Sequence, residues 1–65
     1  MKINSDAIKL LIAKKNMNLS TFADETNISR QWLGVVLSRG YASPKIVNKL
    51  AKGLNVEVSE ILLKE

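Results

Sequence analysis

The sequence predicts an all-α fold, a compact bundle of five short helices. Apolar residues recur at the i, i+3, i+4, i+7 spacing of one helix face in successive segments of the chain. Asparagines, serines and the single proline, which start or stop helices, stand between these segments. The only alternation typical of a strand is Val56-Glu57-Val58, which is too short to pair. These observations leave no room for a sheet.

The first helix is expected from Asn4 or Ser5 to Lys15. Either polar residue can cap its N-terminus, and Asn16 can end it because asparagine tolerates the left-handed conformation. A second helix is expected at 19–26 after the cap residue Asn18, and Asn27 is the next left-handed candidate. The apolar face of the first helix consists of Ile8, Leu11 and Ile12.

The third helix is expected to follow almost at once, at 30–38, with Ser29 as its cap. Residues 40–42 then form a loop. Ser43 and Pro44 are a strong helix start, with serine as the cap and proline at the first helical position, and they predict a fourth helix at 44–54 that Asn55 ends. A fifth helix is expected at 58–64, with Val58, Ile61 and Leu62 turned inward.

Length and composition limit the function classes. The 65 residues form a single domain without cysteine or histidine, so disulfides, the commonest zinc ligand and the commonest general base are absent. Asp24 and Glu25 point about 100° apart on a helix, so they cannot share a site. Because there is also no phosphate-binding glycine loop, we expect neither an enzyme nor a cofactor.

Positive charge is concentrated in one segment. The net charge is +4, and no acidic residue lies between Glu25 and Glu57. Such a distribution indicates a surface that binds a polyanion, although a solvated surface without a ligand gives the same pattern. No apolar run approaches the roughly 20 residues that span a bilayer, and no signal peptide is evident, so we expect a soluble cytoplasmic protein without membrane contact. The basic residues of this segment are Arg30, Arg39, Lys45, Lys49 and Lys52.

The order of small, turn-forming and apolar residues over residues 5–63 resembles that of a known family. The motif at about residues 19–38 reads Ala23, Asn27, Ile28, Ser29, Trp32, Leu33 and Val36. Ile8, Leu11 and Met17 fit the pattern upstream of it, and Ser43, Leu50, Ala51, Leu54, Asn55, Val56, Ile61 and Leu62 fit downstream. The chain is thereby similar to the Xre/Cro family of lambda-repressor-like helix-turn-helix domains. It departs from the family at three turns, where Asn16, Asn27 and Asn55 stand in place of the preferred glycine.

The resemblance implies that the third helix enters the major groove of a double-stranded DNA operator. It implies a sequence-specific transcriptional regulator, most simply a phage- or mobile-element-type repressor that binds as a homodimer without a small-molecule ligand. Its place would be the bacterial cytoplasm, at the nucleoid. The alternatives are an antitoxin-type or restriction-controller regulator, and a protein-interaction module that kept the fold without binding DNA.

The resemblance also assigns residues to the interface. Arginine and glutamine make bidentate contacts to guanine and adenine, and valine can meet a thymine methyl group. Base readout is therefore expected from Arg30, Gln31, Gly34 and Val35. Contacts to the DNA backbone are expected from Leu19, Ser29, Trp32, Ser38, Arg39, Tyr41 and Lys45, and the dimer interface is expected from Ile61, Leu62 and Leu63.

Overall fold

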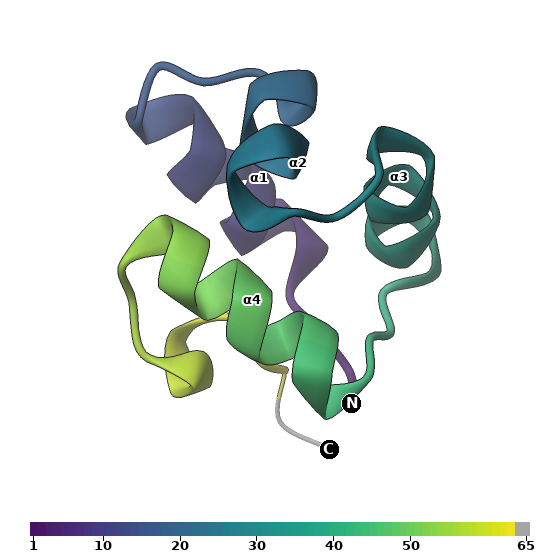
Figure 1. Cartoon of the computed structure of the whole chain (residues 1–65). Coiled ribbons are helices and arrows are strands. Elements are labelled where there is room, and N and C mark those ends of the chain that lie inside the picture. Colours follow the sequence, from purple (N-terminus) through teal and green to yellow (C-terminus); the bar gives the residue numbers. More distant parts are fainter. Residues whose placement is uncertain (64–65) are drawn as a thin grey trace.

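The computed structural model describes residues 1–63 and contains four α-helices followed by a short 3₁₀ turn (Figure 1). The described residues hold no strand beyond two isolated bridges, so the all-α prediction is confirmed. The elements are α1 (Ser5–Lys14), α2 (Leu19–Thr26), α3 (Arg30–Arg39), α4 (Pro44–Leu54) and the 3₁₀ turn η1 (Val58–Glu60).

Each α-helix begins at a polar cap that satisfies a backbone N–H of its first turn. The side-chain oxygens of Asn4, Asn18, Ser29 and Ser43 accept hydrogen bonds of 2.8–3.4 Å from the N–H groups three residues further on. Such a cap contributes about 1 kcal/mol to helix stability. The predicted starts of the four helices are therefore confirmed, with Asn4 as the cap of α1.

The predicted left-handed turns are also confirmed. Asn16, Asn27 and Asn55 have φ angles of 58°, 60° and 57°, and Gly40 after α3 has a φ of 70°. Asparagine is the residue that adopts this conformation most readily after glycine, because its short polar side chain can bond locally. The three asparagines thus end helices where the chain must turn tightly.

The prediction of a fifth α-helix is wrong. Only the single 3₁₀ turn η1 forms, Ile61 ends it, and Leu62 and Leu63 that follow are not helical. The Ile61 N–H still donates to Val58 within the turn at 3.1 Å, but the next backbone groups pair with the N-terminus. Asn4 donates its N–H to the Ile61 carbonyl at 2.8 Å, and Leu63 donates to the Lys2 carbonyl at 3.1 Å. Residues 64–65, the predicted end of that helix, lie outside the described residues.

The N-terminal residues 1–4, here termed the N-terminal clasp, join two distant parts of the chain through backbone hydrogen bonds. This arrangement was not predicted from the sequence. Its backbone pairs with 61–63 on one side and with the α3–α4 loop on the other. Ile3 donates to Gly40 at 3.0 Å, and Ala42 donates to Met1 at 2.9 Å. The side chain of Ile3 is buried in the core. The clasp therefore fixes the loop that connects α3 to α4.

The core draws on every helix and on the clasp. Its largest fully buried side chains are those of Phe22, Ile3, Ile8, Leu33, Leu50, Ile61 and Val47. Thr26 is the one buried polar residue in the described part, and its hydroxyl donates to the carbonyls of Phe22 and Ala23 at 2.9 and 3.2 Å. Its polar atom thus stays paired inside the apolar core, as burial requires.

Helix α4 packs closely against α2 at Gly53. A Cβ atom at this position would lie 2.5 Å from Cγ2 of Thr26 and 3.0 Å from the ring of Phe22. Glycine is therefore required there for packing, although it weakens the helix in which it stands. Gly34 in α3 differs, because the nearest atom to its ideal Cβ is the end of the flexible Arg30 side chain, at 3.1 Å.

We predict opposite effects for two substitutions at the α2–α3 turn. Asn27→Gly should leave stability unchanged or raise it slightly, whereas Asn27→Val should cost on the order of 1–2 kcal/mol because a β-branched residue resists positive φ. Thermal unfolding of both variants measures the difference. Equal melting temperatures would contradict the assigned turn.

The two helical glycines provide a matched pair for a second prediction. Gly34→Ala should raise stability by up to about 1 kcal/mol, since alanine is the better helix former and Arg30 can move aside. Gly53→Ala should lower it by roughly 1–3 kcal/mol, because the new methyl group meets packed side chains. Chemical denaturation of both variants tests this, and a stabilised Gly53→Ala variant would show that α2 and α4 do not approach as described.

Candidate nucleic-acid interface

Helix α3 has one buried and one exposed face. Leu33, Val36 and Leu37 are buried, so the helical period turns the remaining positions toward solvent. The predicted interface residues of this helix share that outer face. Ser29, Arg30, Gln31, Trp32, Val35, Ser38 and Arg39 are exposed, and Gly34 is half-buried.

The turn before α3 determines how this face is presented. Ile28 donates its N–H to the Ala23 carbonyl at 3.0 Å, and its side chain is buried beneath the turn. Ser29 then caps α3 through its hydroxyl oxygen, which accepts from Trp32 at 3.0 Å. In Figure 1, α3 stands to one side of the other three helices. Its outer face is consequently open along the length of the helix.

Arg30 and Gly34 are neighbours on the outer face. A guanidinium nitrogen of Arg30 lies 3.1 Å from the position that a Cβ of Gly34 would occupy. The absence of a side chain at Gly34 therefore lets the Arg30 guanidinium lie along the surface of α3. This places the one cation of the first turn next to the middle of the helix.

Residues that flank α3 differ in how far they reach into solvent. Tyr41 in the α3–α4 loop and Lys45 in the first turn of α4 are exposed, and the N-terminal clasp holds the loop between them. Leu19, at the first position of α2, is half-buried and packs against the core. Its side chain therefore serves packing, and only its backbone suits a contact to phosphate.

A hollow of about 300 Å³ lies between the C-terminal half of α3 and the start of α4. Its lining is mainly apolar, and Arg39 is its only charged side chain. Met1 and Ile46 were not predicted on this surface, because the clasp and the start of α4 bring them there from distant segments. The hollow is lined by Met1, Trp32, Val36, Arg39, Tyr41, Ala42, Ser43 and Ile46.

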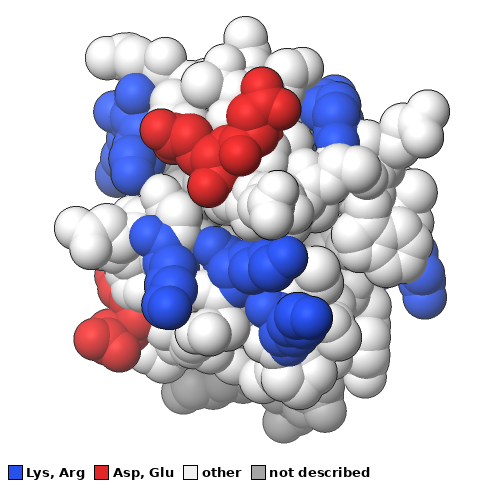
Figure 2. Space-filling model, viewed as in Figure 1, with Lys and Arg blue, Asp and Glu red and all other residues white. Residues whose placement is uncertain are grey.

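Charged side chains are segregated on the face shown in Figure 2. Lys and Arg side chains gather over α4, and Asp and Glu side chains gather over the adjacent α2. The α4 lysines, Lys45, Lys49 and Lys52, share one side of the helix because they are spaced by four and three residues. Positive charge therefore extends from the α3–α4 loop along α4.

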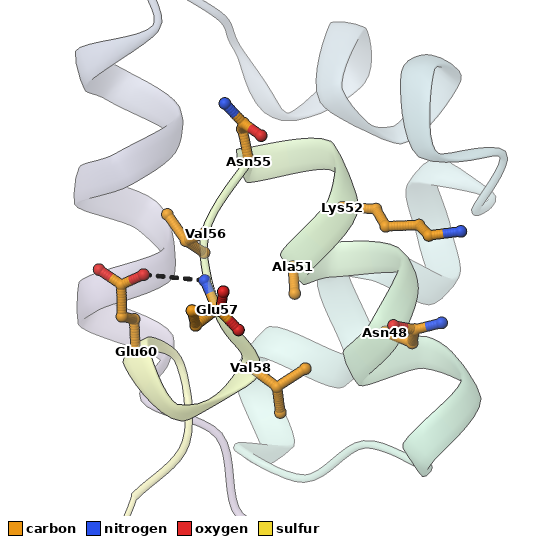
Figure 3. A pocket seen from close by; sticks show the side chains of 8 residues that line it. All are labelled: Asn48, Ala51, Lys52, Asn55, Val56, Glu57, Val58 and Glu60. Atoms are coloured by element: carbon orange, nitrogen blue, oxygen red, sulfur yellow. Dashed lines mark hydrogen bonds between the residues drawn. The ribbon is translucent and has the colours of Figure 1, made fainter.

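A second hollow, of about 410 Å³, lies at the opposite end of α4 from α3 (Figure 3). Asn48 and Lys52 border it from α4, and Val58 borders it from η1. The Glu60 carboxylate accepts a hydrogen bond from the Glu57 N–H at 2.8 Å, so it serves the turn itself.

The three residues predicted at a dimer interface have different environments. Ile61 is completely buried within the chain, so it is not available to a second copy; its side chain fills the core beside the clasp. Leu62 is half-buried and bridges to Ile3, and Leu63 is 47% exposed. Of the predicted set, Leu63 presents the most apolar surface to solvent.

No three His, Cys, Asp or Glu side chains of residues 1–63 come together as a metal site. None of the helices in this range has the length and apolar character needed to cross a membrane. Comparison with family models, curated proteins and solved structures finds no match for the chain.

Proposed function

We propose that this protein is a sequence-specific double-stranded DNA-binding regulator of transcription. In this proposal α2 and α3 act as a helix-turn-helix of the Xre/Cro type, and α3 enters the major groove. The regulator acts most simply as a repressor, because a protein that occupies an operator excludes polymerase.

The observation that carries the proposal is the outer face of α3. It joins Arg30, Gln31 and Val35, three side chains suited to read base edges, and no acidic residue lies anywhere between Glu25 and Glu57. A face that binds a protein partner has no need to exclude acidic residues over two helices. Exclusion of acidic residues is expected for a surface that contacts phosphates.

The flanking residues fit a second role, contact with the DNA backbone. Arg39 is the last residue of α3 and Tyr41 lies in the loop after it. Lys45 lies in the first turn of α4, where backbone N–H groups and the helix dipole favour an anion. Contacts to the DNA backbone determine the register and orientation of a protein on the duplex but carry no sequence information. Ser29, Trp32 and Ser38 are exposed on the same face and suit the same role.

We predict that Arg30 and Lys45 differ in what they contribute to binding. Arg30→Ala should cost roughly 1–3 kcal/mol on a selected cognate duplex and weaken the preference at one base position. Lys45→Ala should weaken cognate and scrambled duplexes about equally and reduce the salt slope by roughly one unit. Affinities on both duplexes over a salt series measure these effects, after selection of the cognate site from random duplexes.

Lys9→Ala, at an exposed position of α1, controls for the loss of one positive charge. Lys9→Ala should alter the affinity for DNA less than Arg30→Ala or Lys45→Ala does. If Arg30→Ala weakens both duplexes to the same extent, α3 does not read the sequence and the proposal fails.

We further propose that the regulator binds as a homodimer through the surface around Leu62 and Leu63. Leu63→Lys should weaken self-association and DNA binding but leave the base preference unchanged, because the residue lies outside the α3 face. The selected site should contain two half-sites about 34 Å apart, or a multiple of that distance. Sedimentation equilibrium and binding assays test this prediction. A monomeric wild-type protein that binds one half-site tightly would contradict it.

A further inference from the structure

The hollow between α3 and α4 exposes aromatic surface to an unusual degree for so small a chain. The sequence holds three aromatic residues, of which Phe22 is buried in the core. The other two, Trp32 and Tyr41, both line this hollow and are 44% and 50% exposed. Exposed large apolar side chains that gather in one place mark a binding surface more often than isolated ones.

The chemistry of the hollow limits its occupant. Its lining combines two aromatic side chains with the guanidinium of Arg39 and contains no acidic residue. Aromatic rings and arginine together suit a flat ring attached to a negative charge, because bases stack on aromatic faces and the cation neutralises a phosphate. A volume of about 300 Å³ is at the lower end of the range for small-ligand sites, so it suits a single ring system.

The hollow is also held in shape. Tyr41 and Ala42 belong to the loop that the N-terminal clasp pairs through Ile3 to Gly40 and through Ala42 to Met1, at 3.0 and 2.9 Å. Trp32 stands on α3, whose N–H at that position is bound to the cap Ser29. Both ring-bearing segments are therefore fixed by backbone hydrogen bonds, which lowers the entropic cost of binding a ligand.

We propose that this hollow binds an unpaired nucleotide of a DNA strand, with the base against Trp32 and Tyr41 and the phosphate at Arg39. Single-stranded DNA is the committed ligand because the hollow adjoins the surface proposed to hold duplex DNA. The protein thus has a second mode of DNA binding, independent of base readout by α3. It goes beyond sequence-specific duplex recognition, and its choice of ligand rests on the proposed function.

Trp32 is the only tryptophan, so its fluorescence reports on the hollow directly. The probe is a short oligothymidylate, and its control is an abasic deoxyribose-phosphate oligomer of equal length and charge. The oligothymidylate should quench Trp32 emission saturably. The abasic oligomer should cause no quenching and should bind about 5- to 150-fold more weakly, the range expected for loss of one stacked base.

Variants separate stacking from charge. Tyr41→Ala should weaken binding of the oligothymidylate by a similar 5- to 150-fold, whereas Tyr41→Phe should preserve it, since stacking needs the ring and not the hydroxyl. Arg39→Gln should reduce the salt slope by about 0.7, the value for one phosphate of a single strand. Leu10 is an exposed apolar residue on α1, and Leu10→Ala should change neither the affinity for the oligothymidylate nor the salt slope. Circular dichroism confirms that each variant folds.

The result distinguishes this proposal from the proposed function. Gln31→Ala should weaken the selected duplex and leave the oligothymidylate unaffected. Equal affinity for the abasic oligomer, or an unaltered affinity of Tyr41→Ala, would overturn the proposal. So would Trp32 emission that responds to protein concentration but not to oligonucleotide, because a second protein surface would then occupy the hollow.

Discussion

The short turn between α2 and α3 is the constraint on which the rest of the structure depends. Asn27 adopts a left-handed conformation, which costs about 1–2 kcal/mol for an ordinary residue and less for asparagine. Ile28, the next residue, is buried, and burial of such a side chain contributes about 1.5–3 kcal/mol. The burial therefore outweighs the cost of the turn. Helix α3 begins two residues after Ile28, with only the cap Ser29 between them. The buried Ile28 side chain therefore determines which face of α3 turns toward the core.

Two further contacts constrain the loop that follows α3 and the position of α4. Residues 1–4 pair with the α3–α4 loop and with 61–63, so the ends of the described chain are tied to the middle of the sequence. The close approach at Gly53 holds α4 against α2. Helix α3 is therefore fixed through the turn before it and through the loop after it.

Local chemistry made much of this fold predictable. Caps such as Ser29 and Ser43 and the turn asparagines act through neighbouring backbone, so the sequence identified the boundaries of four helices. The residues of the outer face of α3 were assigned through the family resemblance, and the helical spacing of the buried Leu33, Val36 and Leu37 leaves them exposed. The N-terminal clasp could not be predicted in this way, because its hydrogen bonds join residues about 40 and 60 positions apart. The same pairing stands in place of the expected fifth helix and leaves Ile61 buried. It therefore explains why the fifth helix does not form and why Ile61 is not available at a dimer interface. Met1 and Ile46 were missed at the hollow for the same reason.

The central claim is that the outer face of α3 and the loop after it form the DNA-binding surface. Its most direct test is an NMR titration of the ¹⁵N-labelled protein with a duplex selected from a random pool. The account predicts that the largest amide shifts lie at residues 29–45, with small shifts in α1 and in the 3₁₀ turn at 58–60. Absence of saturable binding, or largest shifts in α1 or at 58–60, would contradict it.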